Sequence, residues 1–138
     1  YHAACCLMHN RQEAVYKNFW TDFLDDMKIC VQLAREAGVE EDRILLDPGM
    51  GFGKTYEQNL AVINHLDRME ELGFPILLGT SRKSVIGRTL DLPSDQRVEG
   101  TLATTALGII RGAAFVRVHD VRENCGLMRM MEALLAAD

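Results

Sequence analysis

The stretch Leu45–Thr55 reads Leu-Leu-Asp-Pro-Gly-Met-Gly-Phe-Gly-Lys-Thr, and it decides how the rest of the chain is interpreted. A short apolar run leads to Asp47, and three alternating glycines follow it. Thr55 and Gln58 stand three residues apart, which is the spacing of a capping box at a helix start. We therefore predict a buried strand that ends at Asp47, then a glycine loop and a helix. Ligand sites of α/β folds lie at such strand ends.

The glycine loop fails two common phosphate-binding motifs. A P-loop needs a glycine, four residues and then Gly-Lys-Ser/Thr, but Pro48 stands where that first glycine belongs. The dinucleotide fingerprint also fails, because Lys54 occupies the place of its third glycine. Two interpretations are left, a loop for another kind of ligand and a glycine turn without chemistry.

Composition describes an ordinary globular domain over residues 1–138, with 48% hydrophobic and 25% charged residues. The net charge of −5 argues against a nucleic-acid or anionic membrane surface. No apolar run approaches the roughly 18 residues of a membrane span. Four cysteines lack metal-ligand spacing, so we expect small core residues in a reducing cytoplasm. Because the chain enters an apolar run directly at Tyr1, we expect part of a longer protein.

Short apolar runs predict strands at residues 4–8, 43–47, 76–79 and 115–118. Apolar residues at helical spacing predict helices at 15–34, 60–69, 85–90 and 96–111, and a last helix lined by Cys125, Met128, Met131 and Leu135. Gly38 and Gly73 are expected to end the first two helices. Asp120 and Glu123 have the spacing of a capping box before the last one.

Strands that alternate with helices predict an α/β fold with a parallel sheet. Four such units are too few for a closed eight-stranded barrel, which takes about 250 residues. The chain is therefore a small open sheet or half of a barrel. Polar residues follow every strand at the same end, including His9, Asp47, Lys83 and His119. A barrel gathers such residues over one mouth, so we favour the half-barrel.

Two of the predicted loops carry groups that suit a polar ligand. Asp47 is either a structural carboxylate or an acceptor for a ligand with paired N–H donors. Phe52 is either a packing residue or part of the wall around a flat aromatic ligand. Lys83, with neighbouring hydroxyls, predicts an anion-binding or carbonyl-binding loop at a helix start, or else a solvated basic turn. Arg82 is adjacent to Lys83, and we do not expect both in one pocket.

Arg117 and His119 are two residues apart in the last predicted strand and would share a face. An arginine within an apolar strand is costly unless it is paired, which predicts a phosphate or a carboxylate such as Asp47 as its partner. A triad of Ser84, His119 and Asp47 finds no support, because the chain has no nucleophile elbow.

Taken together, these motifs resemble the dihydropteroate synthase family. Asp-Pro-Gly at 47–49 continues into Gly-Phe-Gly-Lys at 51–54, followed by Ser-Arg-Lys-Ser at 81–84 and Arg-Val-His-Asp at 117–120. Leu-Met-His at 7–9 resembles the end of that family's fifth strand. The resemblance covers nearly the whole chain. It implies the C-terminal half of a TIM (β/α)8 barrel, with four β/α units that form strands five to eight.

The resemblance implies a pterin site at the glycine loop. Asp47 would hold the guanidine-like edge of the pterin, and Lys83 its ring N5 and carbonyl region. Phe52 and Gly79 would shape the pterin slot, with Met8 as a further part of its wall.

The same resemblance implies the reaction. The family condenses 6-hydroxymethyl-7,8-dihydropterin diphosphate with p-aminobenzoate to give dihydropteroate and diphosphate in folate biosynthesis. Arg117 and His119 would bind the diphosphate, and with Lys83 they are the expected catalytic residues. Ser84 would lie near the p-aminobenzoate carboxylate. Stabilising a departing diphosphate is electrostatic catalysis, which fits the absence of a strong general base in these motifs.

Further expectations follow from the same family. Mg²⁺ would assist the reaction with its ligand in the missing N-terminal half, so we predict that the isolated chain is inactive. The full-length enzyme is expected to be a cytoplasmic homodimer and a sulfonamide target, without nucleic-acid or membrane partners. Two alternatives stay open. One is a pterin-binding methyltransferase of the folate–corrinoid type, and the other is a non-catalytic pterin-binding module.

Overall fold

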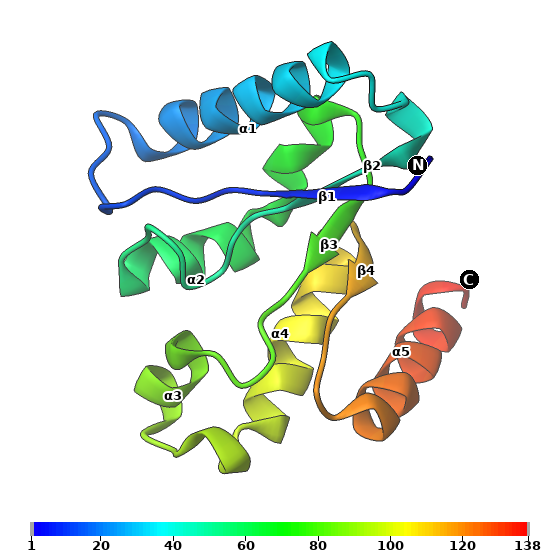
Figure 1. Cartoon of the computed structure of the whole chain (residues 1–138). Helices are drawn as coiled ribbons and strands as arrows, with labels where there is room; N and C mark the ends of the chain where they lie inside the picture. The colour runs from blue at the N-terminus through cyan, green and yellow to red at the C-terminus, as the bar shows by residue number, and fades with distance from the viewer. Residues whose placement is uncertain (1, 138) are drawn as a thin grey trace.

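Four strands form one parallel sheet in the computed structural model, which describes residues 2–137 (Figure 1). They are β1 (Cys5–Met8), β2 (Ile44–Asp47), β3 (Ile76–Leu78) and β4 (Ala113–Val116). The order in the sheet follows the order in the chain, and every neighbouring pair is parallel. Four consecutive β/α units of this kind make half of an eight-stranded TIM barrel. The predicted fold class is therefore confirmed.

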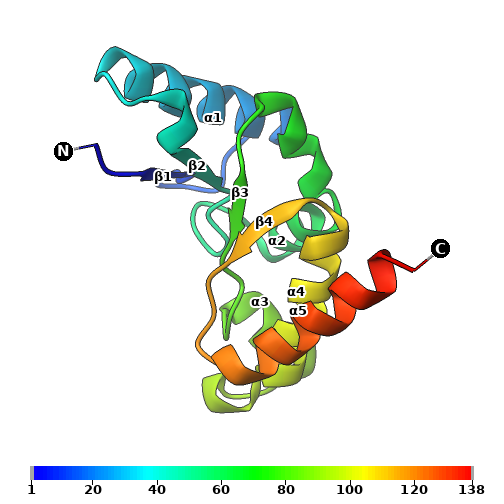
Figure 2. The same cartoon turned by 90° about the vertical axis from the view of Figure 1, so that its right-hand side faces the viewer.

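Helices follow the strands in the order that the sequence predicts. They are α1 (Phe19–Glu36), η1 (Glu41–Arg43), α2 (Tyr56–Asn64), η2 (Leu66–Leu72), α3 (Ser84–Leu90), η3 (Ser94–Gln96), α4 (Val98–Ile110) and α5 (Val121–Leu135), where η marks a 3₁₀ helix. Figures 1 and 2 place α1 beside β1, α4 beside β4, and α5 outermost next to α4. Within residues 2–137, every helix is too short or too polar to span a lipid bilayer.

The two faces of the sheet differ sharply in burial, because side chains alternate along each strand. Leu46 and Leu78 lie on the face that the helices cover and are 0% and 1% exposed. Cys6, Met8 and Phe115 lie on the opposite face and are exposed. In a closed barrel that second face is the interior. The exposed face of the sheet therefore corresponds to the inner surface of half a barrel.

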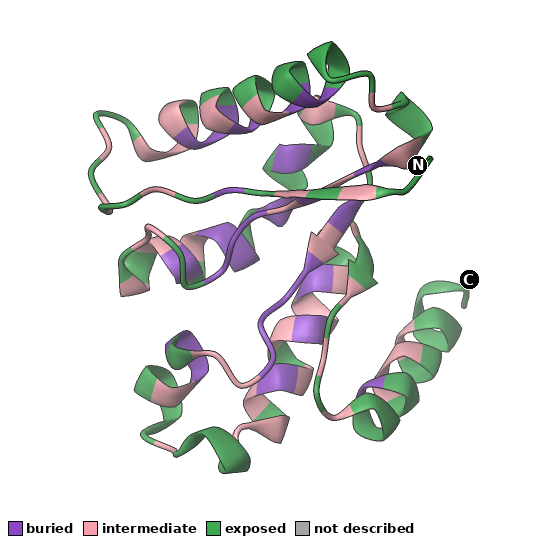
Figure 3. Ribbon diagram, in the orientation of Figure 1, coloured by how far each residue is buried: buried purple, intermediate pink, exposed green. Residues whose placement is uncertain are grey.

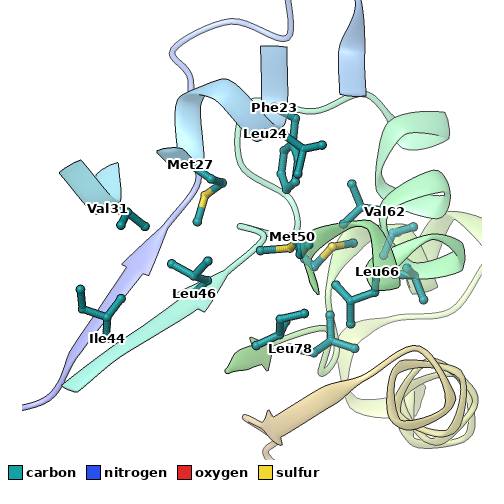
Figure 4. Packing of buried hydrophobic residues seen from close by; sticks show 14 of the residues in the cluster. Phe23, Leu24, Met27, Val31, Ile44, Leu46, Met50, Val62, Leu66 and Leu78 are labelled. Atoms are coloured by element: carbon teal, nitrogen blue, oxygen red, sulfur yellow. The ribbon is translucent and has the colours of Figure 1, made fainter. Parts of the chain in front are cut away.

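The core lies between α1, the covered face of the sheet and the α2–η2 segment (Figure 4). Met27 of α1 lies near Leu46 of β2, and Phe23 of α1 and Leu66 of η2 belong to the same buried cluster. Met50, from the glycine loop, is fully buried in the same cluster. Figure 3 shows that burial is concentrated in this region, whereas α5 is mostly exposed. The glycine loop is thus anchored directly in the core.

The first helix begins later than predicted. α1 starts at Phe19 because the Asn18 side chain caps it, accepting a hydrogen bond from Thr21 N at 3.1 Å. Val15 consequently lies outside the helix and is 68% exposed. The end of the helix agrees with the prediction, since Gly38 just beyond it has a left-handed φ of 80°.

The second predicted helix is split in two. Its capping box is present, but α2 ends at Asn64 and a 3₁₀ helix, η2, continues towards Gly73. Residues three apart lie on the same side of a 3₁₀ helix. The change of winding therefore directs both Leu66 and Met69 into the core, where each is 0% exposed.

The last β/α unit corrects two predictions. β4 ends at Val116, so Arg117 and His119 lie in the loop after the strand rather than within it. Asp120 forms no side-chain cap on α5. Its carboxylate binds Arg82 instead, so the predicted capping box is wrong.

The cysteines are not the core residues that composition predicted. All four are free thiols; Cys6 and Cys125 are exposed, and Cys5 and Cys30 are half-buried. Cys6 is exposed because its side chain lies on the open inner face of the half-barrel.

Candidate functional site

The carboxyl ends of the strands bring the predicted site residues to one edge of the sheet. Met8 and Asp47 are partners in the parallel register, and His9 N donates to Asp47 O at 2.9 Å. At the other end of the sheet, Arg117 N donates to Leu78 O at 3.0 Å. The loops that follow the four strands therefore lie side by side.

Asp47 is a half-buried carboxylate that supports its own turn. Its Oδ1 accepts a hydrogen bond from Gly49 N at 2.7 Å. A carboxylate offers about four acceptor positions on its two oxygens. The rest of the group can therefore accept from a ligand with adjacent N–H donors. The two interpretations of Asp47 are compatible, since one oxygen fixes the turn and the carboxylate keeps its capacity to bind.

The glycine loop, Gly49–Gly53, packs against the end of β1 more closely than any side chain would allow. Gly49 and Gly53 have left-handed φ values of 66° and 56°. A Cβ atom on Gly49 would lie 1.8 Å from His9 O, and one on Gly53 would lie 2.6 Å from Arg11 N. The glycines are therefore required by backbone geometry and by this close approach.

Lys83 reaches the glycine loop from the end of β3. Its Nζ donates to the carbonyl of Met50 and lies 4.9 Å from the centre of the Phe52 ring, a cation–π contact. The Phe52 side chain is 44% exposed and open to a ligand. Burial lowers the pKa of Lys83, while the nearby Asp47 carboxylate opposes that shift and the Arg117 charge adds to it. Lysine, carboxylate and aromatic ring thus form one cluster.

Arg82 points away from Lys83, in agreement with the prediction that both do not share a pocket. Its guanidinium makes two hydrogen bonds to Asp120, of 3.1 and 2.5 Å. The pairing raises the pKa of Arg82 and lowers that of the Asp120 carboxyl. Arg82 also has a left-handed φ of 58°. This bidentate pair ties the loop after β3 to the loop after β4.

Ser81 orients His119, a role that the sequence did not reveal. Ser81 Oγ accepts from His119 N at 3.0 Å and lies 2.9 Å from His119 Nδ1. The serine proton can serve Nδ1, which leaves Nε2–H as a donor towards a ligand. The Ser-Arg-Lys-Ser motif contained this hydroxyl, but its partner lies 38 residues away. The same contact argues against a triad through Ser84, because Nδ1 is already engaged.

Arg117 is exposed, whereas the sequence predicted a costly position inside an apolar strand. The difference arises because β4 ends at Val116, so Arg117 lies in the loop that follows the strand. Among residues 2–137, Asp47 is not an ion-pair partner of Arg117. An anionic ligand is left as the predicted partner, and the exposed His119 side chain lies on the same loop.

The other predicted residues differ in their surroundings. Ser84 is exposed at the first position of α3, and Met8 is 38% exposed on the inner face. Gly79 is buried, yet an added Cβ would meet no atom within 4 Å, so the glycine leaves free space beside the site. His9 is only 1% exposed, and its ring packs 4.6 Å from that of Phe23. His9 therefore lies beneath the glycine loop rather than among the exposed groups.

The resemblance implies a Mg²⁺ whose ligand is expected in the family's N-terminal half. Among residues 2–137, His, Cys, Asp and Glu side chains form no group of three or more that could hold a metal ion. That Mg²⁺ takes its ligand from the family's N-terminal half stays a prediction.

Comparisons with known proteins agree with the motifs. A family model described as pterin binding enzyme matches residues 1–119. The chain is 56% identical over 136 residues to the dihydropteroate synthase of Clostridium beijerinckii, covering 98% of this chain and 51% of that protein.

Solved structures show the same relation. A Clostridium difficile dihydropteroate synthase crystallised in the presence of pteroic acid superposes with a TM-score of 0.94 at 47% identity, covering 99% of this chain and 52% of that one. A Xanthomonas albilineans dihydropteroate synthase with 4-aminobenzoic acid has a TM-score of 0.94 at 34% identity, covering 99% and 51%. The chain thus spans about half the length of the relatives it matches. The resemblance drawn from the motifs is confirmed.

We expect Gly49→Ala to destabilise the fold more than Gly73→Ala. Both glycines have positive φ, 66° and 77°, so both variants incur a left-handed strain of about 1–2 kcal/mol. Only at Gly49 would the new Cβ also collide with His9 O. Urea unfolding of the two variants and the parent chain measures the difference. Equal losses of unfolding free energy would contradict the close packing of the loop on β1.

Proposed function

Because the chain belongs to the pterin binding enzyme family, we propose that it forms one half of a dihydropteroate synthase active site. In the proposed reaction, the p-aminobenzoate nitrogen forms a bond to the methylene carbon of the dihydropterin. The bond from that carbon to the diphosphate oxygen breaks, and the nitrogen loses a proton. The pteroic acid and 4-aminobenzoic acid named for two related structures support this choice of substrates.

The observation that carries the proposal is the cluster of Asp47, Lys83 and Phe52 at the ends of β2 and β3. The half-buried carboxylate suits the adjacent N–H donors on one edge of a pterin. Lys83 donates to Met50 O, which leaves further N–H groups of its ammonium for the ring N5 and carbonyl. Phe52, with its exposed ring, would form one wall of the slot, and the free space beside Gly79 would admit the flat ring system.

Arg117 and His119 would bind the diphosphate. Both are exposed on the loop after β4, one strand away from Lys83. Negative charge accumulates on the bridging oxygen as the carbon–oxygen bond breaks. A guanidinium and the Nε2–H of His119 would stabilise that charge as the diphosphate leaves. The Ser81 contact favours this tautomer of His119, so the donor is oriented before the ligand arrives.

Ser84 would contact the carboxylate of p-aminobenzoate with its exposed hydroxyl. The Mg²⁺ implied by the resemblance would offset diphosphate charge, with its ligands supplied from outside this chain. The residues described above bind and orient the two substrates, and none of them is required to act as a strong base.

Arg117→Ala is expected to weaken binding of the pterin diphosphate by about 10-fold to 100-fold, because a charge-assisted contact contributes about 1.5–3 kcal/mol. Binding of 6-hydroxymethyl-7,8-dihydropterin, which lacks the diphosphate, should be unchanged. Isothermal titration calorimetry with both ligands measures the two affinities. Arg122→Ala, at an exposed arginine of α5, is the matched control. Equal binding of both ligands by the parent chain would favour the methyltransferase alternative.

We also expect the purified 138-residue chain to make no dihydropteroate. The chain covers 51% of the related enzyme's length. The resemblance implies that the rest of the enzyme carries the other half of the pocket wall. Incubation with both substrates and Mg²⁺, followed by chromatographic detection of dihydropteroate, tests this. Turnover by the chain alone would contradict the prediction.

A further inference from the structure

Lys54 has all of its N–H donors engaged beneath the glycine loop. Its Nζ lies 2.9 Å from His9 Nδ1, 3.0 Å from Gly49 O and 3.1 Å from Phe52 O. An ammonium group has three protons and accepts nothing. Three acceptors therefore match three donors. None is left for a substrate, so Lys54 acts on the loop rather than on a ligand.

Asp26 fixes the histidine tautomer that this arrangement needs. His9 Nε2 lies 3.0 Å from Asp26 Oδ2, which can only accept and so places the ring proton on Nε2. His9 Nδ1 then carries a lone pair that accepts from Lys54. Burial and the neighbouring Lys54 charge lower the pKa of His9 to about 4, which agrees with a neutral ring.

The ammonium group binds both ends of a tight turn. Phe52 N donates to Gly49 O at 3.0 Å, and Lys54 contacts this carbonyl and the carbonyl of Phe52. Between these ends, Gly51 N donates to Asn59 Oδ1 at 2.7 Å. Lys54 thus binds the turn at both of its ends, and the buried Asn59 binds it at its middle.

The same turn carries Phe52 and contacts Lys83, and both of these residues are assigned to the pterin. The Phe52 ring and the Met50 carbonyl both contact Lys83 Nζ. A turn that loosened at its ends would shift both groups and release Lys83. The Lys54 contacts and the proposed pterin subsite are therefore coupled through the few backbone atoms of this turn.

We propose that Lys54 is a positioning residue for the pterin subsite, oriented through His9 and Asp26 and acting by holding the Gly49–Phe52 turn closed. The inference rests on the proposed function for the identity of the ligand. The contacts that hold the turn are independent of it. Burial, together with the nearby Lys83 charge, lowers the pKa of Lys54 to about 7, and Asp47 and Asp26 oppose that shift. The three-proton ammonium that makes all three contacts is therefore the dominant form below that pH.

The test compares Lys54→Met with the parent chain by amide hydrogen exchange and by titration. Exchange of the Phe52 amide is expected to accelerate by about tenfold or more. Without the Lys54 contacts, the hydrogen bond from Phe52 N to Gly49 O should open more often. The Leu46 amide, which donates to Pro75 O in the sheet, should not change. Affinity for 6-hydroxymethyl-7,8-dihydropterin should fall, whereas affinity for inorganic diphosphate at Arg117 should stay the same.

Two further variants make the outcome decisive. Lys17→Met removes an exposed lysine from the loop before α1 and should match the parent in every measurement. Lys54→Gln, which keeps N–H donors for one carbonyl, should give an intermediate exchange rate and provides a second test if Lys54→Met folds poorly.

An unchanged Phe52 exchange rate would overturn the proposal. Parallel losses of pterin and diphosphate affinity, with faster exchange at Leu46, would also overturn it by showing a general loss of structure. If the parent chain binds no pterin at all, the proposed function fails, and the exchange rates still decide the role of Lys54.

Discussion

The close packing of the glycine loop against the end of β1 is the contact on which the site depends. Gly49 approaches His9 O so closely that no Cβ could be accommodated. The buried Met50 side chain anchors the same loop in the core. The loop is therefore fixed to the sheet from one side and to the hydrophobic cluster from the other. Asp47, Phe52 and the carbonyl that orients Lys83 take their positions from this arrangement.

Neighbouring strands supply different groups of the site. The ends of β2 and β3 supply a carboxylate, a lysine and an aromatic ring, which suit a flat heterocycle with donors on one edge. The end of β4 supplies Arg117 and His119, which suit an anion. Parallel strands make this division possible, because their carboxyl ends meet at one edge of the sheet. The open inner face explains why groups that would be enclosed in a full barrel are exposed in this chain.

Much of this arrangement could be predicted from the sequence. The strand before Asp47, the capping box at Thr55 and the repeated β/α order are local patterns with a direct physical basis. The predictions that were wrong concern residues whose partners are distant in sequence. Asp120 has the spacing of a helix cap, but Arg82, 38 residues earlier, binds its carboxylate more favourably.

His9 follows a strand like the other polar residues, yet it is buried, because Asp26 and Lys54 provide its hydrogen bonds. Arg117 was predicted inside a strand because apolar residues surround it on both sides. Only the tertiary structure shows that the strand ends at Val116, two residues earlier than predicted, and that the inner face is open. Such pairings depend on the fold, and no local sequence pattern predicts them.

The most direct test of the account is the affinity of Asp47→Asn for 6-hydroxymethyl-7,8-dihydropterin. Asparagine keeps an oxygen that can accept from Gly49 N, so the turn and the unfolding free energy should be preserved. Loss of the negative charge and of one acceptor should weaken binding by about 10-fold to 100-fold, as for other charge-assisted hydrogen bonds. An affinity equal to that of the parent chain would contradict the assignment of Asp47 to the pterin.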